Sequence, residues 1–122
     1  MRSVTVKQLA DACGLTVYSG QEYLDKRLIK TDDMSRPGLE LTGYFDYYPA
    51  ERVQLFGMTE ISFSQRLTPE NQLKVMRQLC TDETPCLVVS RSLPVPESMA
   101  TAAAEKNIPI LGTKSSTSRI AS

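Results

Sequence analysis

The sequence predicts an α/β fold built on a mainly parallel β-sheet. Two features of the second half of the chain support this prediction. Residues 86–89, Cys-Leu-Val-Val, form a continuous apolar run, which is typical of a strand covered on both faces. Strand-like and helix-like segments also alternate between residues 52 and 111. That alternation favours parallel strands joined by right-handed crossover helices.

Length and charge limit the classes of protein to which the chain can belong. Its 122 residues are enough for one domain, which would bury roughly 65% of the surface of the unfolded chain. Lys plus Arg and Asp plus Glu each number 14, so no net charge attracts the chain to nucleic acid or to an anionic membrane. No apolar run approaches the roughly 18 residues of a membrane helix, and no signal-peptide core is present. We therefore expect one cytoplasmic domain over residues 1–122, with neither nucleic acid nor membrane as a partner.

The cysteines and the absence of histidine argue against a metal site. Cys13, Cys80 and Cys86 are odd in number and have no metal-ligand spacing, and the chain has no histidine. Reduced thiols, as in the cytosol, are the default expectation. Without histidine, neither a Ser-His-Asp nor a Cys-His arrangement can form. The sequence thus predicts no catalytic residue and no metal ligand in this chain.

The first helix has clear sequence limits. Thr5 and Gln8 form a T-x-x-Q capping box at its start, and Gly14 is a natural residue to end it. An apolar stripe at helical spacing predicts that Cys13 lies in the core with Val6, Leu9 and Ala10. Short strands are expected at residues 15–18 and 28–29.

Residues 32–57 hold three of the five tyrosines and two of the three phenylalanines. We expect a turn at Arg36-Pro37-Gly38, followed by a short helix that packs aromatic side chains into the core. The preceding Asp32-Asp33 pair is interpreted as a solvated turn rather than a metal site, because adjacent side chains on an extended chain point to opposite faces.

The remaining elements follow from start signals and periodicity. Residues 52–56 alternate as in a partly buried strand, and Thr59 is predicted to cap a helix that extends to about Leu67, with Ile61, Phe63 and Leu67 buried. Thr68-Pro69-Glu70 is a strong helix start. That helix should bury Leu73, Met76, Leu79 and Cys80. A further helix is expected at residues 97–106, ended by Asn107, and a strand at 108–111.

A ligand site is hypothesised where the parallel strands end. In open α/β sheets, ligands gather beyond the carboxyl ends of the strands. Ser90-Arg91 follows one predicted strand. Gly112 to Ser116 follows another and is expected to open a final helix with anion-binding amides. The hypothesis is a small-anion or nucleotide-sugar site made of Ser35, Arg36, Ser90, Arg91 and Arg119.

Two other interpretations bear on this site. Arg36 and Arg91 could instead hold loops together by pairing with acids such as Glu40, Asp46 or Glu51, because structural ion pairs often imitate functional sites. Gly112-Thr113-Lys114-Ser115 imitates the end of a phosphate-binding loop. Thr113, however, separates the glycine from the lysine, and the first glycine of G-x-x-x-x-G-K-[ST] is missing.

The segment Ser35-Arg36-Pro37-Gly38-Leu39-Glu40, together with Gln54-Leu55-Phe56-Gly57, resembles the amino-terminal domain of HPr kinase/phosphorylase. One departure is Met34, where the family usually has isoleucine. The resemblance covers nearly the whole chain, and its further matches are Thr42-Gly43-Tyr44-Phe45, Glu51-Arg52, Glu60, Ser62-Phe63, Thr84-Pro85, Val89-Ser90-Arg91, Leu93, Pro96 and Thr117-Ser118-Arg119.

The resemblance implies a fold and a function. The family fold is a three-layer α/β sandwich similar to the amino-terminal domain of Mur ligases. The parent would be a bifunctional, hexameric bacterial enzyme of carbon catabolite repression. It phosphorylates a serine of the phosphocarrier protein HPr with ATP or pyrophosphate and magnesium, and reverses this with phosphate.

The P-loop, metal ligands and acid/base of the family belong to a carboxyl-terminal catalytic domain that this chain lacks. The resemblance therefore implies a regulatory or assembly domain without catalysis or cofactor of its own, which acts with the catalytic domain and with HPr. The alternative is a small-ligand module that senses a metabolite.

Overall fold

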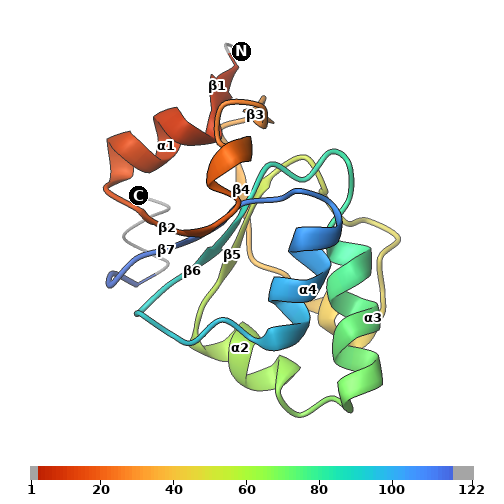
Figure 1. Cartoon of the computed structure of the whole chain (residues 1–122). Helices are drawn as coiled ribbons and strands as arrows, with labels where there is room; N and C mark the ends of the chain where they lie inside the picture. Colours follow the sequence, from red (N-terminus) through yellow and green to blue (C-terminus); the bar gives the residue numbers. More distant parts are fainter. Residues whose placement is uncertain (1–2, 117–122) are drawn as a thin grey trace.

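The computed structural model describes residues 3–116, which form an α/β arrangement around a five-stranded sheet (Figure 1). The strand order is β2-β7-β6-β5-β4, and every pairing is parallel except that of β2 with β7. The five strands are β2 (Thr16–Ser19), β4 (Met34–Ser35), β5 (Val53–Phe56), β6 (Leu87–Val89) and β7 (Ile110–Gly112). The predicted fold class, α/β with a mainly parallel sheet, is confirmed.

Helices cover both faces of this sheet and make three layers. One face carries α2 (Met58–Ser64), α3 (Pro69–Leu79) and α4 (Glu97–Glu105), while α1 (Val6–Cys13) lies on the other (Figure 1). Beside α1, the two-residue strands β1 (Val4–Thr5) and β3 (Leu28–Ile29) pair antiparallel. The 3₁₀ turns η1 (Gln21–Tyr23) and η2 (Leu39–Thr42) complete the described elements. Within residues 3–116, no helix has the length and apolar character needed to span a membrane.

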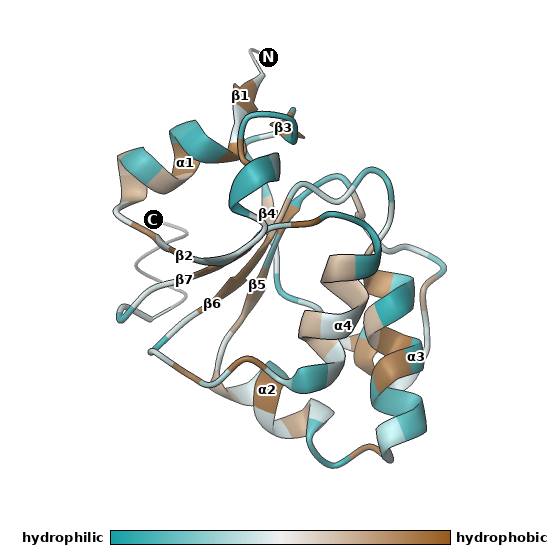
Figure 2. Ribbon diagram, in the orientation of Figure 1, coloured by the Kyte–Doolittle hydropathy of each residue, from teal (hydrophilic) through white to brown (hydrophobic). Residues whose placement is uncertain are grey.

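The core is divided in two by the sheet, because neighbouring residues of a strand point to opposite faces. Phe56, Leu87 and Val89 pack with the helices α2 to α4, whereas Leu55 and Val88 pack towards α1. In Figure 2 the central strands β5 and β6 are hydrophobic, and the outward faces of α1 and α3 are largely hydrophilic. The sequence of β6 is an uninterrupted apolar run because the residues on both of its faces are buried in one of these two cores.

Helix starts with a side-chain cap agree with the sequence. The Thr5 hydroxyl accepts a hydrogen bond from the Gln8 backbone N–H at 3.1 Å, and the Gln8 side chain accepts one from the Thr5 N–H at 2.8 Å. Helix α1 ends at Cys13 and is capped by Gly14, whose φ of 63° is left-handed. Helix α3 begins after Thr68, which accepts a hydrogen bond from the Asn71 N–H at 3.2 Å.

Several predictions of burial were wrong. Cys13 is exposed, because it is the last residue of α1 and lies among exposed residues at positions 11–14. Strand β5 is buried at all four residues rather than on alternate ones, because both of its faces are covered. Gln54 can lie there because its amide nitrogen donates hydrogen bonds to the carbonyl oxygens of Pro49 and Arg52, each at 3.0 Å.

The aromatic segment was also only partly predicted. Phe45 and Tyr48 pack against the core with their rings nearly perpendicular and 5.5 Å apart. Tyr44 and Tyr47 instead lie on the surface, as does Phe63 on α2. The Asp32-Asp33 pair is exposed, as the solvated-turn interpretation requires.

The limits of three elements differ from their predictions. Helix α2 begins after Gly57 rather than at Thr59 and ends at Ser64, three residues short of Leu67. Strand β7 begins two residues later than predicted, because the chain turns at residues 106–107 after α4, where Asn107 has a φ of 58°. No helix begins within residues 112–116, so the anion-binding helix start expected there is absent from the described part of the chain.

Candidate functional site

The four parallel strands bring most of the predicted site residues to one edge of the sheet. Strands β4, β5, β6 and β7 all end there, and the residues that follow them are Arg36, Gly57, Ser90 and Thr113. Arg119 lies outside the described residues. Because neighbouring strands are about 4.8 Å apart, the ends of β4 and β6 are separated by roughly 10 Å. The sheet therefore places the two halves of the predicted site on the same edge but not in contact.

Arg36 is engaged in an ion pair with Glu60 on α2. Its Nη2 atom lies 3.1 Å from each carboxylate oxygen of Glu60, and the arginine side chain is half exposed while the glutamate is nearly buried. The same carboxylate accepts a hydrogen bond from the Gly57 backbone N–H at 2.6 Å. One acid thus fastens the end of β4 to the start of α2.

This pairing partly fits the structural interpretation of Arg36. The arginine does pair with an acid, but that acid is Glu60 and not Glu40, Asp46 or Glu51. Glu40 instead accepts a hydrogen bond from the Gly38 backbone N–H at 3.0 Å. Residue Ser35, the other member of this half of the site, is half-buried within β4.

Ser90 and Arg91 form the other half. Ser90 is fully buried, and its backbone N–H and its hydroxyl both donate to the Phe56 carbonyl oxygen, at 3.0 and 3.4 Å. Arg91 and Ser92 are consecutive non-glycine residues with left-handed φ values of 56° and 52°. Their N–H groups donate to the carbonyl oxygens of Ser115 and Thr113, each at 2.9 Å.

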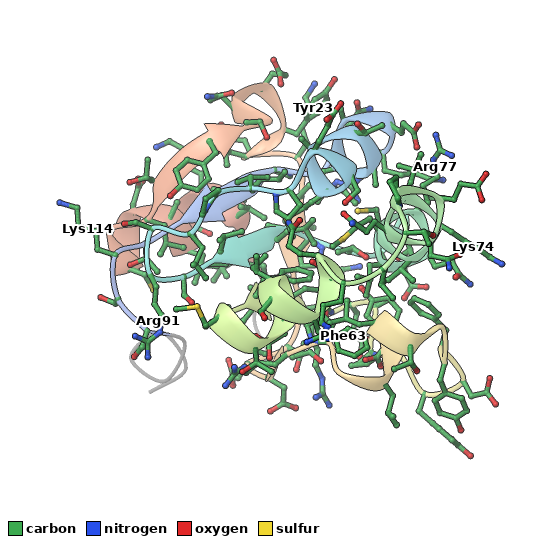
Figure 3. The ribbon with its side chains drawn as sticks, turned by 90° about the horizontal axis from the view of Figure 1, so that it is seen from below. Tyr23, Phe63, Lys74, Arg77, Arg91 and Lys114 are labelled. Atoms are coloured by element: carbon green, nitrogen blue, oxygen red, sulfur yellow. The ribbon has the colours of Figure 1, made fainter. Side chains whose placement is uncertain are left out.

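The strained turn leaves the Arg91 side chain exposed. Figure 3 shows Arg91 and Lys114 on the same side of the molecule, away from the labelled residues of α3. Left-handed backbone is costly for residues with a β-carbon, so the two hydrogen bonds must hold this turn against its own preference. The turn is thus a pre-formed feature of the carboxyl edge.

Gly112, which begins the imitation of a phosphate-binding loop, has a packing role. A β-carbon at Gly112 would lie 2.1 Å from the Tyr18 ring, so a larger residue here would force the ring on the neighbouring strand β2 to move aside. Thr113 is hydrogen-bonded to Val89 through its N–H at 3.1 Å. These contacts agree with the interpretation that the segment is no phosphate-binding loop.

Sequence reasoning missed Arg27, which organises the opposite edge of the sheet. Its guanidinium donates to the backbone carbonyl oxygens of Asp82 at 2.8 Å, of Thr84 and Asn107 at 3.3 Å, and also of Lys106. Arg27 therefore connects the loops that precede β6 and β7. All its acceptors are main-chain atoms distant in the sequence, so no residue pattern could have revealed it.

A cleft of about 350 Å³ lies beside Arg27. It is lined by both signs of charge, with Lys26 and Lys30 facing Glu51, Asp82 and Glu83. Such a mixed lining favours no single charged ligand.

The candidate nucleophiles are poorly placed for chemistry. Burial raises the pKa of the Cys80 thiol and of the Cys86 thiol to about 12. Burial also raises the pKa of Tyr48, whose hydroxyl donates to the Leu79 carbonyl oxygen at 2.6 Å. These groups remain protonated at neutral pH. Within residues 3–116, no three side chains of His, Cys, Asp or Glu gather in a way that could hold a metal ion.

Comparison with known proteins gives the family. Residues 4–122 match the model of a family described as HPr Serine kinase N terminus. The chain is 53% identical over 120 residues to HPr kinase/phosphorylase of Lacticaseibacillus casei strain BL23, and 54% identical over 120 residues to that of Levilactobacillus brevis strain ATCC 367. It is 51% identical over 119 residues to that of Listeria monocytogenes serotype 4a.

Each of these alignments covers 98% of this chain but only 38% of the relative. The chain thus corresponds to less than half of each relative. The family match spans nearly every residue of the described fold and includes both halves of the predicted site. The chain therefore belongs to the family of HPr serine kinase amino-terminal regions.

Proposed function

We propose that the chain is the amino-terminal regulatory and assembly domain of an HPr kinase/phosphorylase, and that it does not catalyse a reaction alone. The observation that supports this proposal is that 98% of the chain aligns with relatives named HPr kinase/phosphorylase, to which it is 51% to 54% identical. The internal contacts of Arg36 and Ser90 and the burial of the thiols agree with a structural role for this region.

The parent enzyme would supply the chemistry. Under this proposal it phosphorylates a serine of HPr with ATP or pyrophosphate and magnesium, and removes that phosphate again, in bacterial carbon catabolite repression. The P-loop and metal ligands would lie in its carboxyl-terminal catalytic domain. The whole protein would act as a hexamer in the cytoplasm.

A kinase assay separates the two parts of this proposal. Purified HPr and Mg-ATP are incubated with the full-length parent protein, and in parallel with the chain 1–122. Phosphoserine on HPr is expected only with the full-length protein. Phosphorylation by residues 1–122 alone would contradict the assignment of catalysis to the other domain. A full-length protein that cannot phosphorylate HPr would contradict the enzyme assignment.

A second candidate is a small-anion or nucleotide-sugar module formed by Ser35, Arg36, Ser90, Arg91 and Arg119. It is favoured by the exposed Arg91 on a pre-formed turn at the carboxyl edge of the sheet. Calorimetric titration with phosphate and with uridine nucleotides at millimolar concentration tests it. A heat of binding that disappears in Arg91→Ala but persists in Arg66→Ala would support this site. The absence of any heat of binding to the intact chain would exclude it.

A further inference from the structure

A cleft of about 430 Å³ lies between the first turns of α3 and α4 and the end of α2, and we call it the helix-end cleft. In Figure 1 these three helix ends lie next to one another. The opposite ends of α3 and α4 are joined by an ion pair of Arg77 with Glu105 at 2.8 Å. The two helices therefore run in the same direction, with both amino-terminal ends at the cleft. Its volume is typical of small-molecule sites, and it shares no residue with the hypothesised anion site.

The first turn of α4 has backbone donors that no side chain caps. Pro96, which precedes the helix, makes no side-chain cap, and the first helical hydrogen bond is donated by the Ala100 N–H to the Pro96 carbonyl oxygen at 3.1 Å. For the N–H groups of residues 97–99, no acceptor is recorded in the described part of the chain. Helix α3 differs, because Thr68 caps it and its first residue, Pro69, has no N–H.

The side chain of Ser98 gives a second, independent observation. Its Oγ atom is buried and has no hydrogen-bond partner among residues 3–116. A hydroxyl in this state is unusual, because it has lost its contact with water without gaining another partner. Ser98 as a whole is partly exposed and lines the cleft, so rotation about χ1 turns the hydroxyl towards it. The fold makes no use of this hydroxyl, whereas a ligand in the cleft would.

The charges around the cleft disfavour a charged ligand. Among the described residues that line it, Glu97 alone is charged. The amino-terminal end of a helix is equivalent to about half a positive charge, so the full negative charge of Glu97 outweighs it for an anion. A cation would meet that positive helix end and a single exposed carboxylate. The cleft therefore favours a neutral ligand.

The rest of the lining fits hydroxyl groups. The amide of Gln65 and the hydroxyl of Thr101 each donate and accept hydrogen bonds. The amide nitrogen of Gln72 already donates to the Leu67 carbonyl oxygen at 2.9 Å, which leaves its amide oxygen as an acceptor. Apolar surface is contributed by Pro69, Leu73 and Pro96. Donors, acceptors and apolar surface thus lie together in one cleft.

We propose that the helix-end cleft binds a neutral polyhydroxylated molecule, such as a monosaccharide or a cyclic polyol. Each hydroxyl of such a ligand accepts a hydrogen bond from the free N–H groups of residues 97–99 or donates one to the oxygens of Gln72 and Glu97. The Ser98 hydroxyl gains its missing partner, and the aliphatic faces of the ligand pack on the apolar surface. This inference does not rest on the proposed function.

Backbone amide NMR spectra of the isotope-labelled chain test the proposal. The chain 1–122 is titrated separately with glucose, with myo-inositol and with inorganic phosphate, each up to millimolar concentration. At least one of the two polyols should cause saturable shifts of the amide signals of residues 97–99, because these N–H groups gain acceptors. The amide signals of residues 113–115 lie outside the cleft and should not move.

The variant Ser98→Ala distinguishes a ligand contact from a structural role. It should weaken polyol binding about fivefold, which corresponds to the loss of one neutral hydrogen bond. Because the hydroxyl is buried without a partner, its removal should leave the urea midpoint unchanged or raise it. Ser62→Ala is the matched control, because Ser62 is exposed on α2 outside the cleft, and it should not change binding.

A second variant tests the opposite wall of the cleft. Gln65→Leu keeps a side chain of similar size but removes the amide, and it should also weaken polyol binding. Gln78→Leu makes the same change at an exposed position of α3 outside the cleft, and binding should be unaffected. Circular dichroism of each variant verifies folding.

The other outcomes overturn the proposal. If neither polyol causes saturable shifts at residues 97–99, the cleft does not bind this class of molecule. Shifts there with phosphate alone mean that the helix end binds an anion instead. Equal polyol binding in Ser98→Ala and Gln65→Leu places the ligand elsewhere, and a lower urea midpoint in Ser98→Ala means that the fold does use the hydroxyl. The kinase assay with the full-length protein tests the proposed function separately.

Discussion

Arg36 and Glu60 join two segments that are 24 residues apart, with one guanidinium nitrogen 3.1 Å from both carboxylate oxygens. The acid is nearly buried and also receives the Gly57 N–H. Since Gly57 has no side chain, Glu60 provides the only side-chain cap recorded for the start of α2 in the described residues. Arg36, which the sequence analysis places in a hypothetical anion site, thus connects β4 to α2 through Glu60.

Replacing Glu60 should therefore destabilise the fold. We expect Glu60→Ala to lower the free energy of unfolding by about 2 kcal/mol, because it removes a helix cap and leaves Arg36 without its partner. Glu60→Gln should cost less, since an amide oxygen can still accept from Gly57. Urea titration followed by circular dichroism measures both changes. Asp11→Ala, which breaks the exposed Lys7–Asp11 pair, is the control and should stay within about 0.5 kcal/mol of the parent chain.

Arg27 should be harder to replace than any other basic residue at its edge of the sheet. Arg27→Lys keeps the charge but cannot reach four carbonyl oxygens at once, and we expect a loss of about 1–2 kcal/mol of stability. Hydrogen exchange at residues 82–84 and 106–107 should accelerate in this variant. Lys26→Arg is the matched control. Unchanged exchange in those loops would show that Arg27 does not hold them.

The buried thiols predict a loss of stability in alkaline solution. The pKa of Cys80 and of Cys86 is about 12 in the folded protein, against about 9 when the thiol is exposed. Above pH 9 the unfolded chain releases protons that the folded chain keeps, so unfolding is favoured increasingly as pH rises from 9 towards 12. Urea midpoints measured from pH 7 to pH 11 should fall in the alkaline range.

Variants identify the groups responsible for that decline. Cys86→Val should make the alkaline decline shallower, while Cys13→Ala should leave it unchanged because Cys13 is exposed. Tyr48 adds to the decline in the same direction, because burial also raises its pKa. A decline of equal slope in Cys86→Val would contradict the assignment to this thiol.

Thiol reactivity gives a separate prediction at neutral pH. A disulfide reagent should modify Cys13 within the mixing time of a manual assay, whereas Cys80 and Cys86 should react only after unfolding. Counting modified thiols in native buffer and in urea by mass spectrometry tests this. Rapid native modification of all three thiols would show that the core opens readily.

The Arg91–Ser92 turn should be improved by glycine. Ser92→Gly removes the β-carbon from a residue with φ of 52°, and we expect a gain of about 0.5–1 kcal/mol in stability. Ser19→Gly is the matched control, because Ser19 lies in β2 and glycine weakens a strand by a similar amount. Thermal unfolding of both variants should show shifts of opposite sign. If Ser92→Gly also destabilises, the turn is not strained.

Much of this fold can be predicted because its signals are local. Thr5 with Gln8, and Thr68 with Pro69, carry their helix caps within three residues. The apolar run of residues 86–89 indicates directly that both faces of β6 are covered. Gln54 could not be foreseen as buried, because the loop carbonyls that accept hydrogen bonds from its amide nitrogen become available only after the chain turns.

The candidate site was less predictable for the same reason. The parallel sheet, read from the alternation of elements, places Ser90 at the carboxyl edge, whereas Arg36 reaches that edge through β4, a strand that the sequence analysis did not predict. Which acid Arg36 meets depends on how α2 packs, and the true partner Glu60 is farther away in the sequence than the acids considered. Tertiary placement, rather than residue type, decides whether such an arginine is available to a ligand.

The antiparallel pairing of β2 with β7 has a consequence for folding during synthesis on the ribosome. Strand β2 leaves the exit tunnel early, yet it lies at the edge of the sheet, and its partner Ile110–Gly112 is among the last described segments to emerge. Until β7 has emerged, β2 has no strand to pair with, and its polar backbone groups stay open to other nascent chains. The pairing of β2 therefore has to wait until β4, β5 and β6 have all been synthesised.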